Sequence, residues 1–197
     1  MIFHFDHPHS GNVAEISEVV GGKGASLWAM TSRLGLPTPA GFTIGVDTCA
    51  VLDKSGVTED FTATMDNAIA RLEAKTGRQL GDRENPLLLA VRSGASVSMP
   101  GMMETILNVG VTPLTLPALQ NSAGGHFFAL DSYRRFLEGF CKSMLGIDRS
   151  TFDAQAKENT DLADHTKNLE AVVSEQIGAE RLCDARYLLN ECIHAVI

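Results

Sequence analysis

The stretch that most constrains the fold runs from Asn85 to Gly110 and has the sequence NPLLLAVRSGASVSMPGMMETILNVG. It opens with an unbroken apolar run from Leu87 to Val91, and a short run of this kind favours a strand that is buried on both faces. A second β-prone segment extends from Thr105 to Val109. The residues between the two include a Gly-Ala-Ser segment and a Met-Pro-Gly-Met-Met run, so the sequence predicts two strands joined by a glycine-containing loop.

Polar groups gather at the end of the first predicted strand. Arg92 and Ser93 follow the apolar run directly, and glycines lie in the loop beyond them. A cation and hydroxyls beside free backbone N–H groups form a place where a phosphate group can bind. The alternative is an ordinary hairpin whose arginine points to solvent, and these residues alone do not decide between the two.

A second glycine-rich segment, VVGGKG, spans Val19 to Gly24. Its glycines predict a tight turn, followed by a helix from Ala25 to Leu34 that Gly35 ends. Lys23 precedes this helix, where a cation can help to hold an anion at the helix N-terminus. The glycine spacing matches neither the Walker phosphate loop nor the dinucleotide-binding fingerprint, so the pattern alone favours a structural turn.

The rest of the chain predicts short strands early and amphipathic helices late. Met1 to Phe5 and Gly41 to Ile44 have strand-like patterns. Apolar residues recur at helical spacing in most of the remaining segments, as in the stripe Phe61, Met65, Ile69 and Leu72. The fold class that we expect is α+β, with a small sheet and several helices. Helices are predicted over residues 47–55, 58–77, 117–121, 126–145, 150–158, 162–177 and 180–197.

Charge and cysteine usage exclude some classes of protein. The formal charge of −8 and the pI near 5.2 argue against partners such as nucleic acid or a membrane surface. No apolar run approaches the ~20 residues that span a bilayer, and no secretory leader opens the chain, so we expect a reducing cytoplasm. The four cysteines, which form no CxxC pair and are expected to be buried free thiols, are Cys49, Cys141, Cys183 and Cys192.

The N-terminal residues raise the question of a metal site. His4, Asp6, His7 and His9 lie close together in the sequence. Histidines and a carboxylate can bind a transition metal, but scattered histidines in a mobile chain terminus are far commoner. We therefore predict a mobile terminus and no metal-binding residues.

Together these motifs resemble the nucleotide-binding domain of pyruvate, phosphate dikinase. The signature of that family is close to NPLLVSVRSGA, followed by SMPGMM, an acidic residue and TILN, and residues 85–108 match it in order. The segment 20–42, with GGKG, RLGLP and PAGF, resembles the opening of the same domain. The segment 131–136, DSYRRF, resembles the family's helix after the signature. The resemblance extends from about residue 10 to the C-terminus.

The resemblance implies a fold and a set of ligands. It implies part of an ATP-grasp-like domain that binds ATP and phosphate with Mg²⁺ and sends a phosphoryl group to a histidine on another domain. A further domain of the family passes that group to pyruvate, which yields phosphoenolpyruvate. Cations and Mg²⁺ balance the charge that develops in such a transfer. The residues that match family positions near the nucleotide are Lys23, Arg92, Ser93, Gly101, Met102, Met103 and Thr105.

This sequence departs from the family pattern in three respects. Ser96 replaces an arginine that is common shortly after Arg92, so one cation near the phosphates is missing. Glu104 replaces the usual aspartate, which is a milder change. The chain also stops at Ile197, so we expect a nucleotide-binding lobe over 1–110 and an incomplete helical segment over 111–197, without the metal-binding carboxylates, the phosphohistidine or the pyruvate domain.

Three hypotheses follow. The first is the nucleotide-binding part of a dikinase, which alone binds ATP weakly without turnover, has no catalytic residue, and has as partner a complementary chain that carries the other domains. The second, favoured by Ser96 and the early stop, is a stand-alone degenerate module that acts through protein partners. The third is a lobe of a phosphoenolpyruvate synthase-like protein, which is disfavoured because that relative lacks the SMPGMM loop found here.

Overall fold

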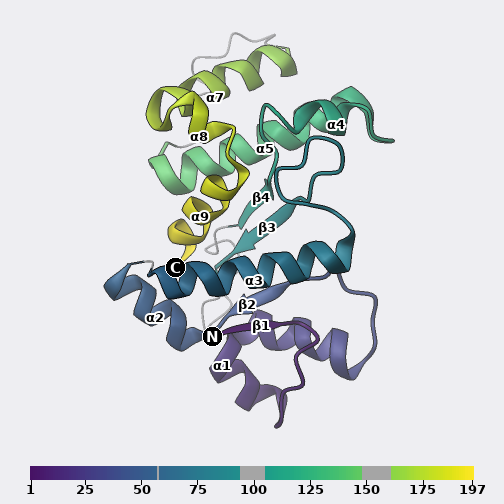
Figure 1. Cartoon of the computed structure of the whole chain (residues 1–197), viewed down its shortest axis with the longest axis vertical. Coiled ribbons are helices and arrows are strands. Elements are labelled where there is room, and N and C mark those ends of the chain that lie inside the picture. Colours follow the sequence, from purple (N-terminus) through teal and green to yellow (C-terminus); the bar gives the residue numbers. More distant parts are fainter. Residues whose placement is uncertain (57, 94–104, 148–160) are drawn as a thin grey trace. The chain divides into compact units, whose positions relative to one another are not determined.

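The computed structural model describes residues 1–56, 58–93, 105–147 and 161–197 (Figure 1). Within these ranges the chain is mostly helical and contains two separate two-stranded antiparallel sheets. It divides into two compact units. The first unit is Met1–Gly77, together with Ser93 and Ile197. The second is Arg78–Arg92 and the described part of the chain from Thr105 to Val196.

The first unit combines one small sheet with three α-helices and a short π-helix. Strands β1 and β2 pair with Ile2 opposite Ile44 and His4 opposite Phe42. Helices α1 and α2 contact each other, and α3 contacts β1. The bounds of these elements are β1 Ile2–His4, α1 Val13–Trp28, the π-helix η1 Ala29–Arg33, β2 Phe42–Ile44, α2 Val46–Ser55 and α3 Glu59–Thr76.

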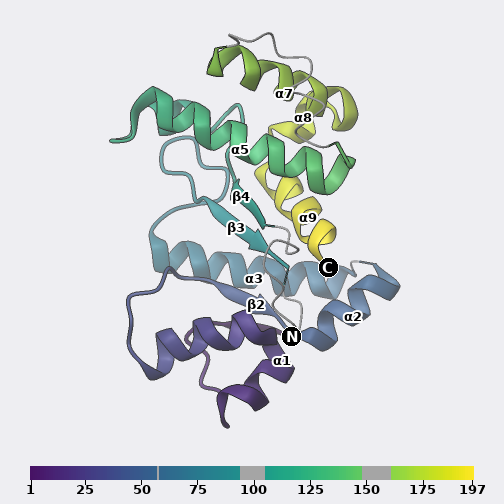
Figure 2. The ribbon, with the colours of Figure 1, turned by 180° about the vertical axis from the view of Figure 1, so that it is seen from behind.

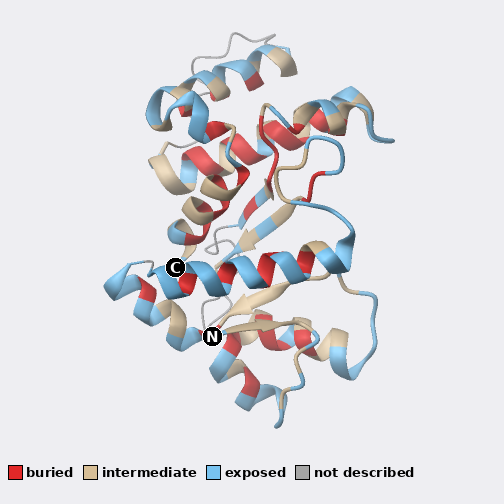
Figure 3. Cartoon of the chain, viewed as in Figure 1, coloured by how far each residue is buried: buried red, intermediate tan, exposed pale blue. Residues whose placement is uncertain are grey.

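Side-chain burial explains why α3 forms where the sequence predicts it. The predicted stripe is confirmed, because Phe61, Met65, Ile69 and Leu72 are all buried, and the red positions recur along α3 in Figure 3. The hydroxyl of Thr58 accepts a hydrogen bond from the backbone N–H of Phe61 at the start of the helix. Gly77 ends the helix in the left-handed conformation, which costs a residue without a side chain little.

The N-terminal segment is held in place by ring contacts and hydrogen bonds, so the prediction of a mobile terminus is wrong. The indole Nε1 of Trp28 donates to the backbone oxygen of His7 at 2.8 Å. The His9 ring meets Trp28 edge to face at 5.6 Å between centroids and also lies 4.7 Å from the ring of His7. The guanidinium of Arg33 lies over the Trp28 ring, 5.9 Å from its centroid.

The second unit is built around the long helix α5, Gly125–Leu145. This helix contacts α4, α7 and β4, and it lies between α7 and β4 in both views (Figures 1 and 2). Of the apolar residues that recur at helical spacing in this segment, Phe136, Leu137 and Phe140 are buried, together with Tyr133, whereas Phe127 is 72% exposed and does not belong to the core. The other elements of the unit are β3 Leu89–Arg92, β4 Thr105–Val109, α4 Leu116–Gln120, α7 Leu162–Ile177, α8 Ala179–Leu182 and α9 Ala185–Val196.

Two predictions about the second unit need correction. The strand β3 is not buried on both faces, since Ala90 and Arg92 are exposed and alternate with partly buried residues. Helices cover only one face of this two-stranded hairpin, so partly buried and exposed side chains alternate along β3. The last predicted helix is two helices, because the chain breaks near Asp184, whose carboxylate accepts hydrogen bonds from the backbone N–H groups of Arg186 and Tyr187. The predicted helix 150–158 lies outside the described residues.

The cysteines are all free thiols, as predicted, but only two of them are fully buried. Burial raises the pKa of the Cys141 thiol to about 11 and that of the Cys192 thiol to about 12. Cys49 and Cys183 are partly exposed, which corrects the prediction for those two. None of the helices that the structure describes has the length and apolarity that a membrane span requires.

Replacement of Gly21 by alanine should destabilise the first unit. Gly21 interrupts α1 with φ 74° and ψ 161°, a conformation that is essentially reserved for glycine. We expect Gly21→Ala to lower the free energy of unfolding by about 1–3 kcal/mol. The matched control is Gly22→Ala, because an added Cβ there would meet only Ser17 Oγ, at 3.7 Å, and should leave stability unchanged or raise it by up to about 1 kcal/mol. Urea unfolding followed by Trp28 fluorescence measures both, and equal losses would contradict the assigned break.

The stability of the first unit should also fall on mild acidification. Burial, followed by the nearby His7, lowers the pKa of His9 below its usual value. The unfolded chain therefore binds a proton at a higher pH than the folded chain, so stability is highest above about pH 6.5 and is lost as pH falls. We expect His9→Phe to reduce the difference in unfolding free energy between about pH 7.5 and about pH 5.5. Exposed His126, replaced by glutamine, is the control, and an unchanged difference in His9→Phe would refute the assignment.

Candidate functional site

Two glycines of the VVGGKG segment determine the backbone conformation and packing around Lys23. Gly21 breaks α1, so the chain from Gly22 onward begins a new helical direction. Gly24 is buried against β2, where an added Cβ would lie 2.9 Å from Thr43 Oγ1 and 3.1 Å from the Thr43 methyl group. A side chain at position 24 would push the helix away from the strand. The predicted tight turn is thus a single-residue break within α1.

Lys23 occupies the first turn after this break. Its side chain is partly exposed, and no hydrogen bond or ion pair connects it to any residue that the structure describes. Backbone N–H groups near the start of a helix carry partial positive charge, which a nearby lysine reinforces. The ammonium group of Lys23 is therefore an available cation beside the backbone of Gly22 and Gly24.

The second candidate region is the end of the β3–β4 hairpin that is nearest in sequence to the connection between its two strands. Arg92 is the last residue of β3 and lies directly opposite Thr105, the first residue of β4. Both are exposed, so a guanidinium and a hydroxyl share the uncovered face of the hairpin. The guanidinium of Arg92 makes no ion pair or hydrogen bond with any residue in the described part of the chain. The structure therefore brings together two of the residues that the sequence places near a phosphate.

The remaining sequence-predicted site residues are less well placed. Ser93 follows Arg92 immediately and is partly buried. Gly101, Met102 and Met103 lie outside the described residues. Lys23 belongs to the first unit and Arg92 to the second, so each region is described on its own.

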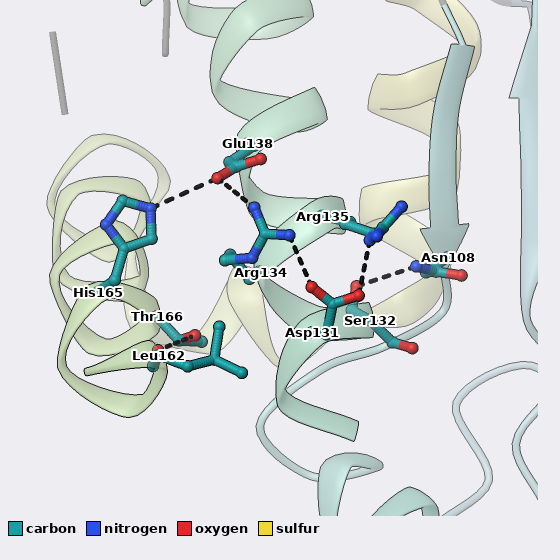
Figure 4. A network of polar contacts seen from close by, with 9 residues as sticks. All are labelled: Asn108, Asp131, Ser132, Arg134, Arg135, Glu138, Leu162, His165 and Thr166. Atoms are coloured by element: carbon teal, nitrogen blue, oxygen red, sulfur yellow. Dashed lines mark hydrogen bonds and ion pairs between the residues drawn. The ribbon is translucent and has the colours of Figure 1, made fainter. Parts of the chain in front are cut away.

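An ion-pair network on α5 was not predicted from the sequence (Figure 4). Arg134 lies between two carboxylates, with Nη2 at 2.6 Å from Asp131 Oδ1 and Nη1 at 2.6 Å from Glu138 Oε1. Arg135 Nε binds the other oxygen of Asp131 at 2.7 Å. Glu138 also faces His165 on α7, with 3.4 Å between Oε1 and Nε2, so the network joins two helices.

The pKa values in this network reflect competition between burial and ion pairing. Burial alone would raise the pKa of Asp131, but the hydrogen bonds and charges of Arg134 and Arg135 outweigh it and hold that pKa below its usual range. The spacings of three and four residues between Asp131 and the two arginines signal such pairs on a helix. The contact with His165 depends on how α7 packs, and no local pattern reveals it.

A small pocket in the first unit contains further charged groups. Its lining includes His4, Asp6, Arg71 and Lys75. The carboxylate of Asp6 accepts hydrogen bonds from Arg71 Nη2 at 3.0 Å and Lys75 Nζ at 2.9 Å, which fastens the N-terminal segment to α3. The hydrogen bond from Lys75 is the main cause that lowers the pKa of Asp6. Both cations already hold a carboxylate, so the pocket has a structural explanation.

The described residues contain no group of three or more His, Cys, Asp or Glu side chains that could hold a metal ion. His7 and His9 contact each other, Phe3 and Trp28, as parts of an aromatic cluster.

Comparison with known proteins gives one consistent result. The chain is 41% identical over 176 residues to pyruvate, phosphate dikinase of Rickettsia typhi, which covers 88% of this chain and 20% of that protein. It is 39% identical over 183 residues to pyruvate, phosphate dikinase of Clostridium symbiosum, covering 85% and 21%. The protein of the same name from Giardia intestinalis is 46% identical over 141 residues, covering 69% and 15%. No family model matches the chain. The chain spans about a fifth of the length of these relatives, and the resemblance inferred from the motifs is confirmed.

The two neighbouring arginines of α5 should differ sharply when replaced. The Arg134 side chain is 15% exposed and holds two carboxylates, whereas that of Arg135 is 54% exposed and holds one. We expect Arg134→Gln to lower the free energy of unfolding by about 1–3 kcal/mol, since Glu138 and Asp131 lose a charged partner. The matched variant Arg135→Gln should change it by less than about 1 kcal/mol. Chemical denaturation at neutral pH measures the unfolding free energy of both variants. A larger loss in Arg135→Gln than in Arg134→Gln would contradict the central role assigned to Arg134.

Proposed function

We propose that this chain, which is homologous to about a fifth of the length of pyruvate, phosphate dikinase, is a nucleotide-binding segment of a phosphotransferase of that kind. The ligands that we assign to it are ATP and inorganic phosphate. The fold that we propose for the segment is part of an ATP-grasp-like domain. Turnover of pyruvate to phosphoenolpyruvate is a property of the whole family protein, and we expect this chain alone to bind ATP without completing that reaction.

The observation that supports this proposal best is the pairing of Arg92, the last residue of β3, with Thr105, the first residue of β4. A guanidinium presents several N–H donors in a plane and suits the oxygens of a phosphate. The Thr105 hydroxyl on the same face can donate one more hydrogen bond. Both side chains are exposed and Arg92 has no carboxylate partner among the described residues, so its charge is available to a ligand.

Lys23 is the second cation that we assign to the nucleotide. It stands beside the backbone N–H groups that follow the break at Gly21, where an anion is stabilised by both charge and hydrogen bonding. Ser93 and the motif residues Gly101, Met102 and Met103 complete the proposed set on the strength of the family motif. Each of these groups acts by holding and orienting phosphate oxygens, which is the main protein contribution to phosphoryl transfer.

Magnesium is expected to arrive with the nucleotide. When bound with the nucleotide, Mg²⁺ would balance the negative charge of its phosphates. The described residues offer cations and hydroxyls rather than a group of carboxylates, so they fit the phosphates of the nucleotide and not the metal itself. We therefore assign no metal ligand within the part of the chain that the structure describes. The partner that we propose is a complementary chain, or chain segment, that carries the rest of the family protein.

Calorimetric titration of the purified chain with ATP and Mg²⁺ tests the proposal. We expect saturable binding that is weakened by about tenfold or more in both Lys23→Ala and Arg92→Ala, because each removes a charge-assisted hydrogen bond. Lys54→Ala on α2 and Arg83→Ala before β3 are matched controls, since both side chains are exposed cations outside the family motifs.

If a folded chain shows no ATP binding, or binding that neither substitution weakens, the proposal is wrong for this chain. The alternative of a degenerate module that acts through protein partners would then take its place.

A further inference from the structure

We infer that Asn108 is a positioning residue for the proposed phosphate site, because it holds a one-residue bulge in β4 that makes Thr105 the neighbour of Arg92. The inference rests on the proposed function for its ligand. The bulge itself is a property of the hairpin, and it can be tested separately.

The pairing of the two strands shows that β4 contains an extra residue. Leu89 pairs with Val109, and the next pair along the hairpin is Val91 with Ile106. Between these pairs β3 has a single residue, Ala90, whereas β4 has two, Leu107 and Asn108. Two residues opposite one is the defining feature of a β-bulge.

The bulge decides which face each residue of β4 occupies. Side chains three positions apart point to opposite faces of a regular strand. Ile106 and Val109 are three apart, yet both are fully buried, at 0% exposure. Leu107 and Thr105 are exposed. Because of the extra residue, Ile106 faces the core like Val109, and Thr105 faces outward.

Without the extra residue, the hairpin would present a different group to the ligand. If pairing continued regularly from Leu89 and Val109, Arg92 would lie opposite Ile106. An apolar side chain would then occupy the exposed face, and the Thr105 hydroxyl would leave its place beside the guanidinium. Directly opposed residues have Cβ atoms about 4.5–5.5 Å apart, so this choice decides whether a hydroxyl and a guanidinium can reach the same phosphate.

Asn108 is the residue that carries the bulge. Its φ of 57° is the only positive φ of a non-glycine residue in the described ranges. Asparagine tolerates this left-handed conformation better than other side chains do, whereas β-branched residues are strongly disfavoured in it. The residues after it are equally constrained: Val111 N donates to Asn108 O at 3.1 Å, and a Cβ on Gly110 would lie 2.4 Å from Leu87 O.

The Asn108 side chain also fastens the bulge to helix α5. Its amide Nδ2 donates to the backbone oxygen of Ser132 at 3.0 Å, as Figure 4 shows. Helix α5 is the element that packs against β4, so this hydrogen bond fixes the strand relative to its own core. The core and the proposed ligand site are thereby connected through one residue.

The experiment compares Asn108→Val with Asn108→Gly in the full chain. Valine disfavours the left-handed conformation, whereas glycine keeps it and loses only the hydrogen bond to Ser132. We expect Asn108→Val to bind ATP with Mg²⁺ about tenfold more weakly than the unmodified chain. Asn108→Gly should stay within about threefold of the unmodified chain. Val173→Ala, at a buried site on α7 away from the hairpin, controls for general loss of stability.

A second readout does not depend on nucleotide binding. Backbone nuclear Overhauser effects between Arg92 and Thr105 should be present in the unmodified chain and in Asn108→Gly, and lost in Asn108→Val. If the unmodified chain fails to bind ATP, the proposed function fails, while these cross-strand signals still test the bulge.

Three results from the single variants would each overturn the inference. These are cross-strand signals that persist in Asn108→Val, ATP affinities that fall equally in the valine and glycine variants, or a loss in Val173→Ala that matches the loss in Asn108→Val. A double-mutant cycle adds a further check: if Asn108 acts through Thr105, Asn108→Val should weaken ATP binding far less when Thr105→Val is already present. Full additivity of the two effects would also overturn the inference.

Discussion

The second unit depends on the packing of α5 against its neighbours. The buried face of this helix carries large side chains at 0% exposure, including Tyr133, Phe136 and Phe140. It contacts α7 and α4 as well as β4. A two-stranded hairpin is at best marginally stable on its own, so β3 and β4 need this helix to hold them. The polar end of the hairpin, with Arg92 and Thr105, is therefore positioned by apolar packing on its other face.

The sequence predicts those elements whose burial repeats along one helix face. The stripe on α3 is of this kind, because a helix that packs on one side must repeat its apolar residues about every 3.6 positions. The burial of β3 was predicted wrongly for a specific reason. Leu87 is buried before the strand begins, and its backbone N–H donates to Gln79 O at 2.8 Å, so part of the apolar run belongs to a different contact.

Features that depend on tertiary contact or on a single backbone angle were not predictable. The contact between His165 and Glu138 requires α7 to lie against α5. The π-helix η1 and the extra residue of β4 are changes of hydrogen-bond register, and side-chain periodicity does not encode them. For the candidate site, the motif placed Arg92 beside a second strand, but the identity of its cross-strand neighbour depended on the unpredicted bulge.

An anionic ligand of this acidic chain needs positive charge that the protein does not already neutralise. The net charge is −8, so an anionic ligand needs cations that no carboxylate of the protein already holds. Asp6 holds Arg71 and Lys75, and Asp131 and Glu138 hold Arg134. A phosphate would have to displace those carboxylates, at the cost of leaving them unpaired. Lys23 and Arg92 hold no carboxylate of the described residues, so a phosphate can bind them without such a loss. Available charge does not by itself select these two cations, because exposed Lys54 and Arg83 also hold no carboxylate of the described residues; the family motif makes the selection.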